Sequence, residues 1–87
     1  MPEISRFYGI IILMFFGDHE PPHFHVRYSG YKAKVEIKTG EIMEGDLPRR
    51  ALRLIQDWIE IHESELLDNF EKCRMRRDDW KSIEPLK

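Results

Sequence analysis

Residues 23–37 read His23-Phe24-His25-Val26-Arg27-Tyr28-Ser29-Gly30-Tyr31-Lys32-Ala33-Lys34-Val35-Glu36-Ile37, in which apolar and polar side chains alternate on both sides of Ser29-Gly30. Alternation with a period of two is typical of strands with one buried face. A two-residue hairpin loop then fixes the register. One face pairs Tyr28 with Tyr31, Val26 with Ala33 and Phe24 with Val35. The other face pairs Arg27 with Lys32, His25 with Lys34 and His23 with Glu36.

The segments that flank this hairpin predict more strands. Residues 7–16 are rich in isoleucine and phenylalanine and end at Gly17-Asp18, which predicts a central strand buried on both faces. Thr39-Gly40 predicts a second hairpin that places Ile42 opposite Ile37 and Met43 opposite Glu36. We therefore expect a three- to four-stranded antiparallel meander.

Beyond Gly45 the apolar period changes to 3.6, which indicates helix. Pro48 suits a first helical turn, and the apolar stripe comprises Ala51, Leu54, Ile55, Trp58, Ile59 and His62. Ser64 can cap a second helix that carries Leu66, Leu67 and Phe70, and one bent helix through His62 is the alternative. The predicted fold is α+β, with two C-terminal helices packed on one face of the sheet and the apolar tail packed back onto the body.

Length and composition limit the architecture and the setting. A chain of 87 residues with 41% hydrophobic content can build one core, so we expect residues 1–87 to form a single domain. The formal charge of −2 gives no overall attraction to phosphate. A single cysteine, the absence of a recognisable secretory signal and an apolar run too short to cross a bilayer predict a cytoplasmic protein without a membrane partner.

Three of the four histidines lie within residues 19–25, and imidazoles readily transfer protons near neutral pH. The register predicts that His23 and His25 project together toward solvent beside Lys34. One ring could act as general base and the other as general acid, with Lys34 stabilising a phosphate and Glu36 orienting His23. This set is typical of a metal-independent ribonuclease. Substrate-binding residues would be Arg27 and Lys32, with His19 and Arg49 as further contacts.

Two other functions fit the same residues. Imidazoles two apart on a strand can chelate one divalent transition-metal ion, with His19 or Asp18 completing the set of His23 and His25. Alternatively, the His/Lys/Arg face is a non-catalytic surface that meets an acidic protein, or simply the solvated side of the sheet. We rank the metal site below phosphate chemistry, so no cofactor is the first expectation. The sequence leaves a homodimer open.

Four segments resemble a bacterial family known only as domain of unknown function 4160: residues 2–9, 18–26, 45–51 and 83–86. The Asp18-His19-Glu20-Pro21-Pro22-His23-Phe24-His25 segment is the most specific of them. The resemblance implies a small protein encoded beside a second small protein, as in type II toxin-antitoxin modules, with this chain in the toxin position. It therefore implies a cognate antitoxin-like partner, with RNA as a candidate target.

Overall fold

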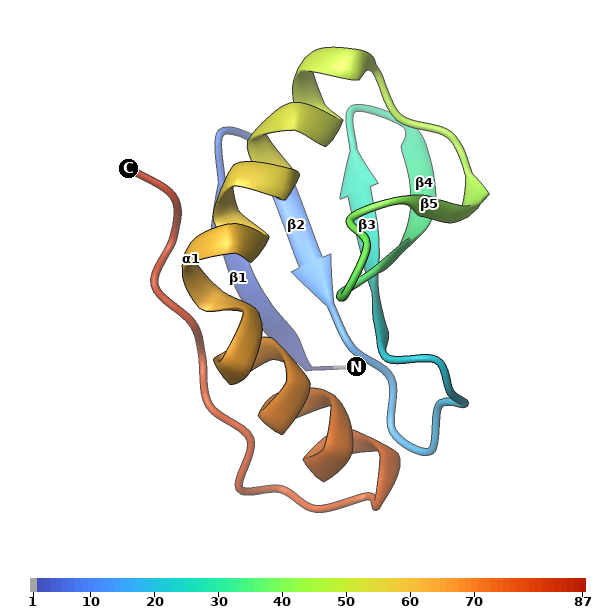
Figure 1. Cartoon of the computed structure of the whole chain (residues 1–87), viewed down its shortest axis with the longest axis vertical. Coiled ribbons are helices and arrows are strands. Elements are labelled where there is room, and N and C mark those ends of the chain that lie inside the picture. Colours follow the sequence, from blue (N-terminus) through green and yellow to red (C-terminus); the bar gives the residue numbers. More distant parts are fainter. Residues whose placement is uncertain (1) are drawn as a thin grey trace.

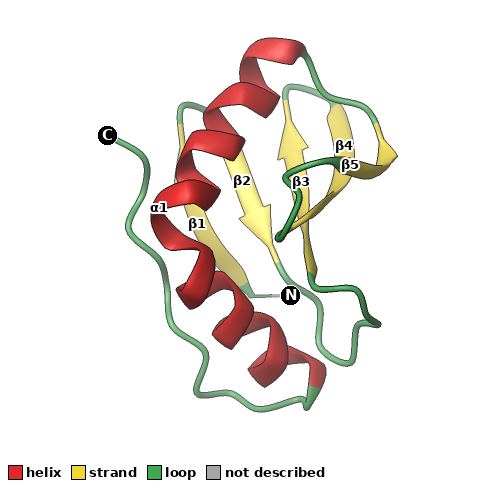
Figure 2. Cartoon of the chain, in the orientation of Figure 1, coloured by secondary structure: helices red, strands yellow, loops and turns green. Residues whose placement is uncertain are grey.

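The computed structural model of the chain describes residues 2–87 and contains one antiparallel sheet with a long helix across one face (Figures 1 and 2). The strands follow one another in spatial order: β1 (Glu3–Phe7), β2 (Ile10–Leu13), β3 (His23–Tyr28), β4 (Tyr31–Glu36) and β5 (Ile42–Gly45). The helix α1 spans Arg49–Arg74. The α+β meander is confirmed, but it has five strands and one helix rather than three to four strands and two helices.

The β3–β4 hairpin forms in the predicted register. All six expected pairs are present, from Tyr28 opposite Tyr31 to His23 opposite Glu36. Ser29 and Gly30 adopt φ values of 46° and 88°, as a two-residue loop with two left-handed positions requires. This hairpin places Phe24 and Val26 on the side of the core, where both side chains are fully buried.

The prediction of one strand over residues 7–16 is wrong. The chain turns at Tyr8-Gly9, whose φ values of 50° and 79° form a second loop with two left-handed positions. This turn creates the β1–β2 hairpin, so β2 lies between β1 and β3. Ile10, Ile12 and Leu13 are all buried, so β2 carries side chains buried on both faces, as the apolar run indicated.

The predicted register of the last hairpin is also wrong. Ile42 lies opposite Val35, and Glu44 lies opposite Lys34, with an irregularity between these two pairs. The N–H of Glu36 donates to the carbonyl of Glu41, at 2.9 Å. The loop therefore spans residues 37–40 instead of only Thr39-Gly40. Gly45 ends β5 with φ +85°, and a Cβ atom there would lie 2.2 Å from the carbonyl oxygen of Lys32.

The prediction of two helices is wrong, and the alternative of one bent helix is confirmed. The helix passes through Ser64 without ending and bends at His62, which has φ −119° and ψ 20°. Side chains before and after the bend are buried: Ala51, Ile55, Trp58, Ile59, Leu66 and Phe70. Because burial of these side chains in the core stabilises both halves of the helix, the tendency of Ser64 to cap a new helix does not interrupt it.

Trp58 lies at the centre of the core and is fully buried. Its ring packs against Phe7 and Phe24, with centroid distances of 5.1 and 5.9 Å. Its indole N–H donates to the carbonyl of Glu84 in the C-terminal tail, at 2.8 Å. The tail therefore packs back onto the body, as predicted. Among residues 2–87 no helix is long and apolar enough to cross a membrane.

Candidate metal centre

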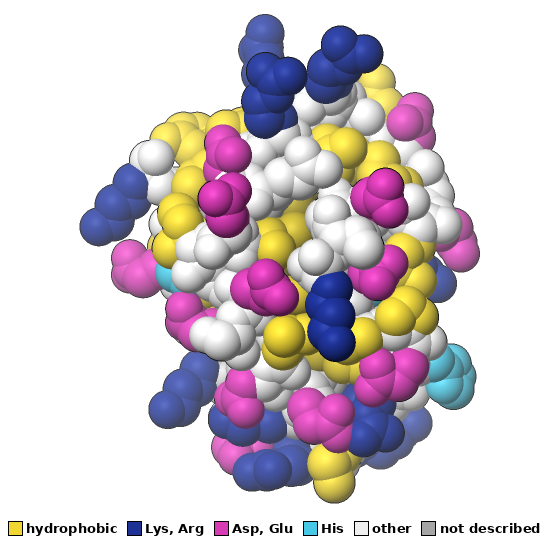
Figure 3. All heavy atoms as spheres, in the orientation of Figure 1, with side chains coloured by type: hydrophobic (Ala, Val, Ile, Leu, Met, Phe, Trp, Pro, Cys, Tyr) yellow, Lys and Arg dark blue, Asp and Glu magenta, His cyan; other side chains and the backbone are white. Residues whose placement is uncertain are grey.

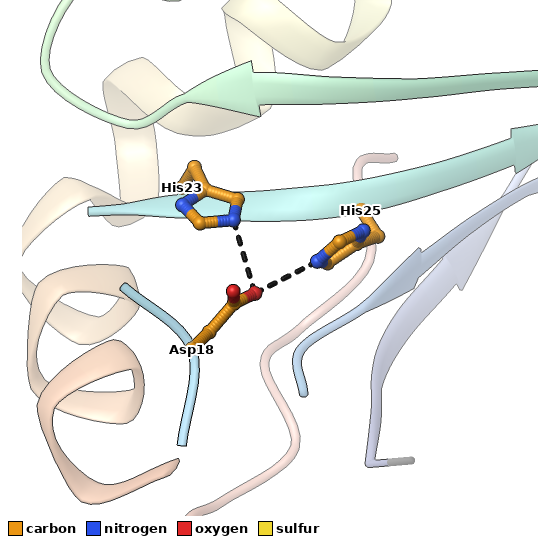
Figure 4. A group of neighbouring side chains, drawn as sticks. All are labelled: Asp18, His23 and His25. Atoms are coloured by element: carbon orange, nitrogen blue, oxygen red, sulfur yellow. Dashed lines mark hydrogen bonds and ion pairs between the residues drawn. The ribbon is translucent and has the colours of Figure 1, made fainter. Parts of the chain in front are cut away.

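Asp18, His23 and His25 meet at the end of the sheet where the loop after β2 leads into β3 (Figure 4). Asp18 Oδ2 lies 3.0 Å from His23 Nε2 and 2.8 Å from His25 Nε2. The three ligating atoms all lie within 4.8 Å of one another. The alternation of β3 brings the two imidazoles to the same side, and the loop supplies the carboxylate between them.

Backbone contacts hold the Asp18 loop in place. Gly17 has φ +73°, and its N–H donates to the carbonyl of Cys73 near the C-terminal end of α1, at 2.9 Å. The backbone N–H of His19 donates to Asp18 Oδ1, at 3.1 Å. These bonds fix the carboxylate while leaving Oδ2 directed at the histidines.

His23 is buried, with a side chain only 5% exposed. Its Nδ1 lies 2.8 Å from the carbonyl oxygen of Pro21, and because a carbonyl only accepts, Nδ1 must carry the proton. In a neutral ring Nε2 then presents a lone pair toward the carboxylate, so this buried atom makes no hydrogen bond although Asp18 Oδ2 lies 3.0 Å away. The expectation that His23 projects to solvent is wrong, because Phe70 of α1 packs against its ring, 5.6 Å between centroids.

His25 is more accessible, with a side chain 14% exposed. Its ring stacks on Phe15 at a centroid distance of 3.8 Å. Burial lowers the pKa of His25, the hydrogen bond and charge of Asp18 oppose this, and the charges of His23 and Lys34 add to the lowering. The net result is a pKa below the usual range, which favours the neutral ring that can bind a metal ion.

Asp18 is kept ionised by its surroundings. Burial alone would raise the pKa of Asp18, but the hydrogen bond from His25, the charge that His23 carries when protonated and the backbone N–H of His19 together lower it below the usual range. The carboxylate is therefore available as an anionic ligand at neutral pH.

An open hollow of about 500 Å³ adjoins this cluster. Asp18 and His25 line it together with Arg27, Lys32, Lys34 and Glu44, whereas His23 lies outside its lining. Lys34 Nζ lies 3.5 Å from a carboxylate oxygen of Glu44. The structure thus gathers His25 with three of the predicted cationic residues around one space.

The other predicted site residues lie elsewhere. Glu36 faces His23 across the hairpin, but the two ring nitrogens of His23 face Pro21 and Asp18, so Asp18 and not Glu36 is the carboxylate beside that ring. Exposed His19 is not part of the three-residue cluster. Arg49 begins α1 and does not line the hollow.

Sequence reasoning missed three participants: Phe15, the carbonyl of Pro21 and Glu44. Phe15 belongs to an apolar run that indicated only core packing. The Pro21 carbonyl carries no signal in a side-chain pattern. Glu44 reaches the hollow only because β5 pairs in the shifted register described above, which no turn rule indicated.

Two imidazoles and one carboxylate on one side are the ligand set found around catalytic zinc and non-haem iron. The buried, unpartnered Nε2 of His23 is the observation that distinguishes this cluster from an ordinary hydrogen-bonded group. A cation beside Nε2 and Oδ2 would remove the repulsion between their lone pairs. The residues present therefore fit a divalent transition-metal ion.

The family model described as "Domain of unknown function (DUF4160)" matches residues 9–71. The chain belongs to this family, which confirms the resemblance seen in its motifs. The matched range includes all three residues of the cluster. No curated protein and no solved structure matches the chain.

Proposed function

We propose that this member of a family of unknown function is a metal-binding protein in which Asp18, His23 and His25 hold one divalent transition-metal ion at the edge of the cationic hollow. The observation that carries the proposal is the buried Nε2 of His23, which lies 3.0 Å from Asp18 Oδ2 but makes no hydrogen bond, and which is an acceptor when the ring is neutral and protonated at Nδ1. Burying an acceptor without a partner is costly, and a metal ion compensates for that cost.

The ligand set favours certain ions. Imidazole nitrogen suits Zn²⁺, Fe²⁺, Co²⁺ and Ni²⁺, whereas Mg²⁺ and Ca²⁺ prefer oxygen. Three protein ligands leave coordination positions for a substrate. A bound ion would supply Lewis acidity toward an oxygen atom of an anionic group in the hollow. Lys34, Lys32 and Arg27 line the same space and would hold the anion.

Metal binding is tested by titrating tag-free, chelator-treated protein with Co²⁺ and following the visible absorption of the ion. We expect one ion per chain, and displacement of Co²⁺ by Zn²⁺ but not by Mg²⁺. Asp18→Asn and His25→Ala should abolish the signal. His19→Ala is the matched control, because His19 lies in the same loop outside the cluster and should leave binding unchanged. Wild-type protein that binds none of these transition metals contradicts the proposal.

A second candidate is the metal-independent ribonuclease. It is favoured by the 2.8 Å hydrogen bond between His25 and Asp18 beside Lys34, an arrangement in which an oriented imidazole acts as general base next to a phosphate-binding cation. Buried His23 would then act on His25 through Asp18 rather than touch the substrate. RNA cleavage that persists in chelator and is lost in His25→Ala supports this candidate, and chelator-sensitive cleavage supports the metal centre.

We also propose, from the family resemblance, that the chain is the toxin-like member of a pair with an antitoxin-like partner. Inducible expression in a bacterial host tests this role. Growth inhibition that the neighbouring small protein relieves, and that Asp18→Asn abolishes without loss of soluble protein, is the expected result. Cells that grow equally with wild type and Asp18→Asn contradict a toxic role for this site.

A further inference from the structure

Two cations lie opposite each other on the sheet face that α1 does not cover. Arg27 and Lys32 form a cross-strand pair in the β3–β4 hairpin, and both are exposed. Within residues 2–87, no carboxylate lies within 4.0 Å of either side chain. Like charges directly opposite each other destabilise a sheet. The next pair along the hairpin differs, because Lys34 is neutralised by Glu44.

The overall charge of the chain is opposite in sign to this pair. The chain carries a net charge of −2, and on the helix side acidic side chains are spread over the middle and are mixed with Lys and Arg at the lower end, while Lys and Arg gather at the upper end (Figure 3). Arg27 and Lys32 therefore form a local concentration of positive charge on an otherwise slightly acidic protein. An external anion would relieve their mutual repulsion.

The same two residues connect two hollows. Arg27 and Lys32 line the hollow beside the metal centre and also a second hollow of about 170 Å³ at the tips of the hairpins. The second hollow is lined by Ile11, Tyr28, Tyr31 and Gly9 as well. Tyr31 is 41% exposed, and Gly9 has no side chain to fill the space above the Tyr28 ring, from which a Cβ atom would be 3.7 Å away. The second hollow thus offers aromatic surface directly beside the cations.

We propose that this track binds single-stranded nucleic acid, with phosphates at Arg27 and Lys32, a base against Tyr31 and Tyr28 in the second hollow, and the chain continuing toward the metal centre. Proteins that bind single strands combine cationic grooves with aromatic side chains on which bases stack. A duplex hides its bases from such a hollow, and an aliphatic polyanion such as polyglutamate has no flat ring to fill it. This inference depends on the proposed function in one respect: the phosphate backbone of the bound strand would be the anion that reaches the metal centre. Binding of the strand itself does not require the metal.

Binding is measured by the fluorescence anisotropy of labelled oligouridine and oligodeoxythymidine at low ionic strength. Chelator is present throughout, so the result does not depend on metal. We expect both single strands to bind, and an equal-length duplex and polyglutamate to bind at least about tenfold more weakly. A preference between the two single strands reports whether the 2′-hydroxyl is read.

Variants locate the track. Arg27→Gln and Lys32→Gln should each weaken binding and lower the slope of log affinity against log salt by about 1. Tyr31→Ala should weaken binding by about fivefold or more. Lys38→Gln is the matched control, since Lys38 is an exposed cation just beyond the same hairpin and should leave affinity unchanged.

Three results overturn the inference: no binding of either single strand, binding of duplex or polyglutamate as tight as that of the single strands, or an equal loss of affinity in Lys38→Gln. None of them affects the proposed metal centre, which is measured by Co²⁺ titration. Conversely, wild-type protein that binds oligonucleotide but no metal leaves this inference standing and refutes the metal centre.

Discussion

Replacing Asp18 by asparagine should have opposite effects on stability and on metal binding. The amide has the shape of the carboxylate but places an NH₂ group where Oδ2 contacts both histidines. That group can donate to the buried lone pair of His23 Nε2, now unpartnered, and to His25 Nε2 if His25 shifts its proton to Nδ1. The substitution removes the anionic ligand and at the same time satisfies the buried acceptor.

The magnitude follows from these contacts. Satisfying a buried acceptor stabilises by about 1–3 kcal/mol, and exchanging the charged bond between His25 and Asp18 for a neutral one costs about 1 kcal/mol. We therefore expect metal-free Asp18→Asn to exceed wild type by about 1 kcal/mol, or roughly 4–8 °C in Tm. Metal at one hundred times its Kd adds about 2.7 kcal/mol to wild type and nothing to the variant, so the order reverses.

Thermal unfolding followed by circular dichroism, first in chelator and then in excess Zn²⁺, measures both effects. Asp57→Asn on α1 is the control, because Asp57 is exposed and outside the cluster. If Asp18→Asn loses about 3–5 kcal/mol in chelator and Zn²⁺ does not stabilise wild type, then Asp18 and His23 form a buried ion pair and the reasoning from the lone pair is refuted.

Three further predictions concern stability. In chelator, the free energy of unfolding should fall as pH decreases below about 6.5. The folded state lowers the pKa of both His25 and Asp18, so the unfolded chain binds more protons over this range. Urea titrations in which the free energy of unfolding stays constant from about pH 7 to 4 contradict this prediction. Gly45→Ala should cost at least about 2 kcal/mol, because its Cβ would meet the Lys32 carbonyl, whereas Gly30→Ala, which has a similar φ but open space around it, should cost clearly less in the same titration. Asn69→Leu should cost about 1–3 kcal/mol by removing both bonds to the Lys81 backbone, while Lys81→Ala should be nearly neutral; equal losses in their Tm values would show that the Lys81 side chain matters.

The sequence predicts local structure best where two independent signals agree. In residues 23–37 the alternation and the Ser29-Gly30 turn require the same register, and that register forms. At Tyr8-Gly9 only the glycine indicates a turn, because tyrosine rarely adopts positive φ, so the apolar run predicts one continuous strand. At Ser64 a capping residue indicated a helix start, but burial of Leu66 and Phe70 outweighs that tendency.

The candidate site was predictable in its histidines but not in its arrangement. The strand period correctly places His23 and His25 on one side, together with Lys34. The burial of His23 depends on Phe70, which is 47 positions away in the sequence and reaches the ring only through the packing of α1. The choice between Asp18 and Glu36 as the neighbouring carboxylate depends on the path of a loop rather than on strand pairing.

The C-terminal tail bears on how the domain should be trimmed. Residues 9–71 carry the family match, yet β1 and the tail, both beyond it, hold each other through the bond from Ile83 N–H to the carbonyl of Ile4. Cutting the chain at the limits of the match would remove both segments together, leave the indole N–H of Trp58 without its acceptor, and expose an unpaired edge of β2 to other molecules. Shortened versions should therefore aggregate even though they keep every residue of the proposed metal centre.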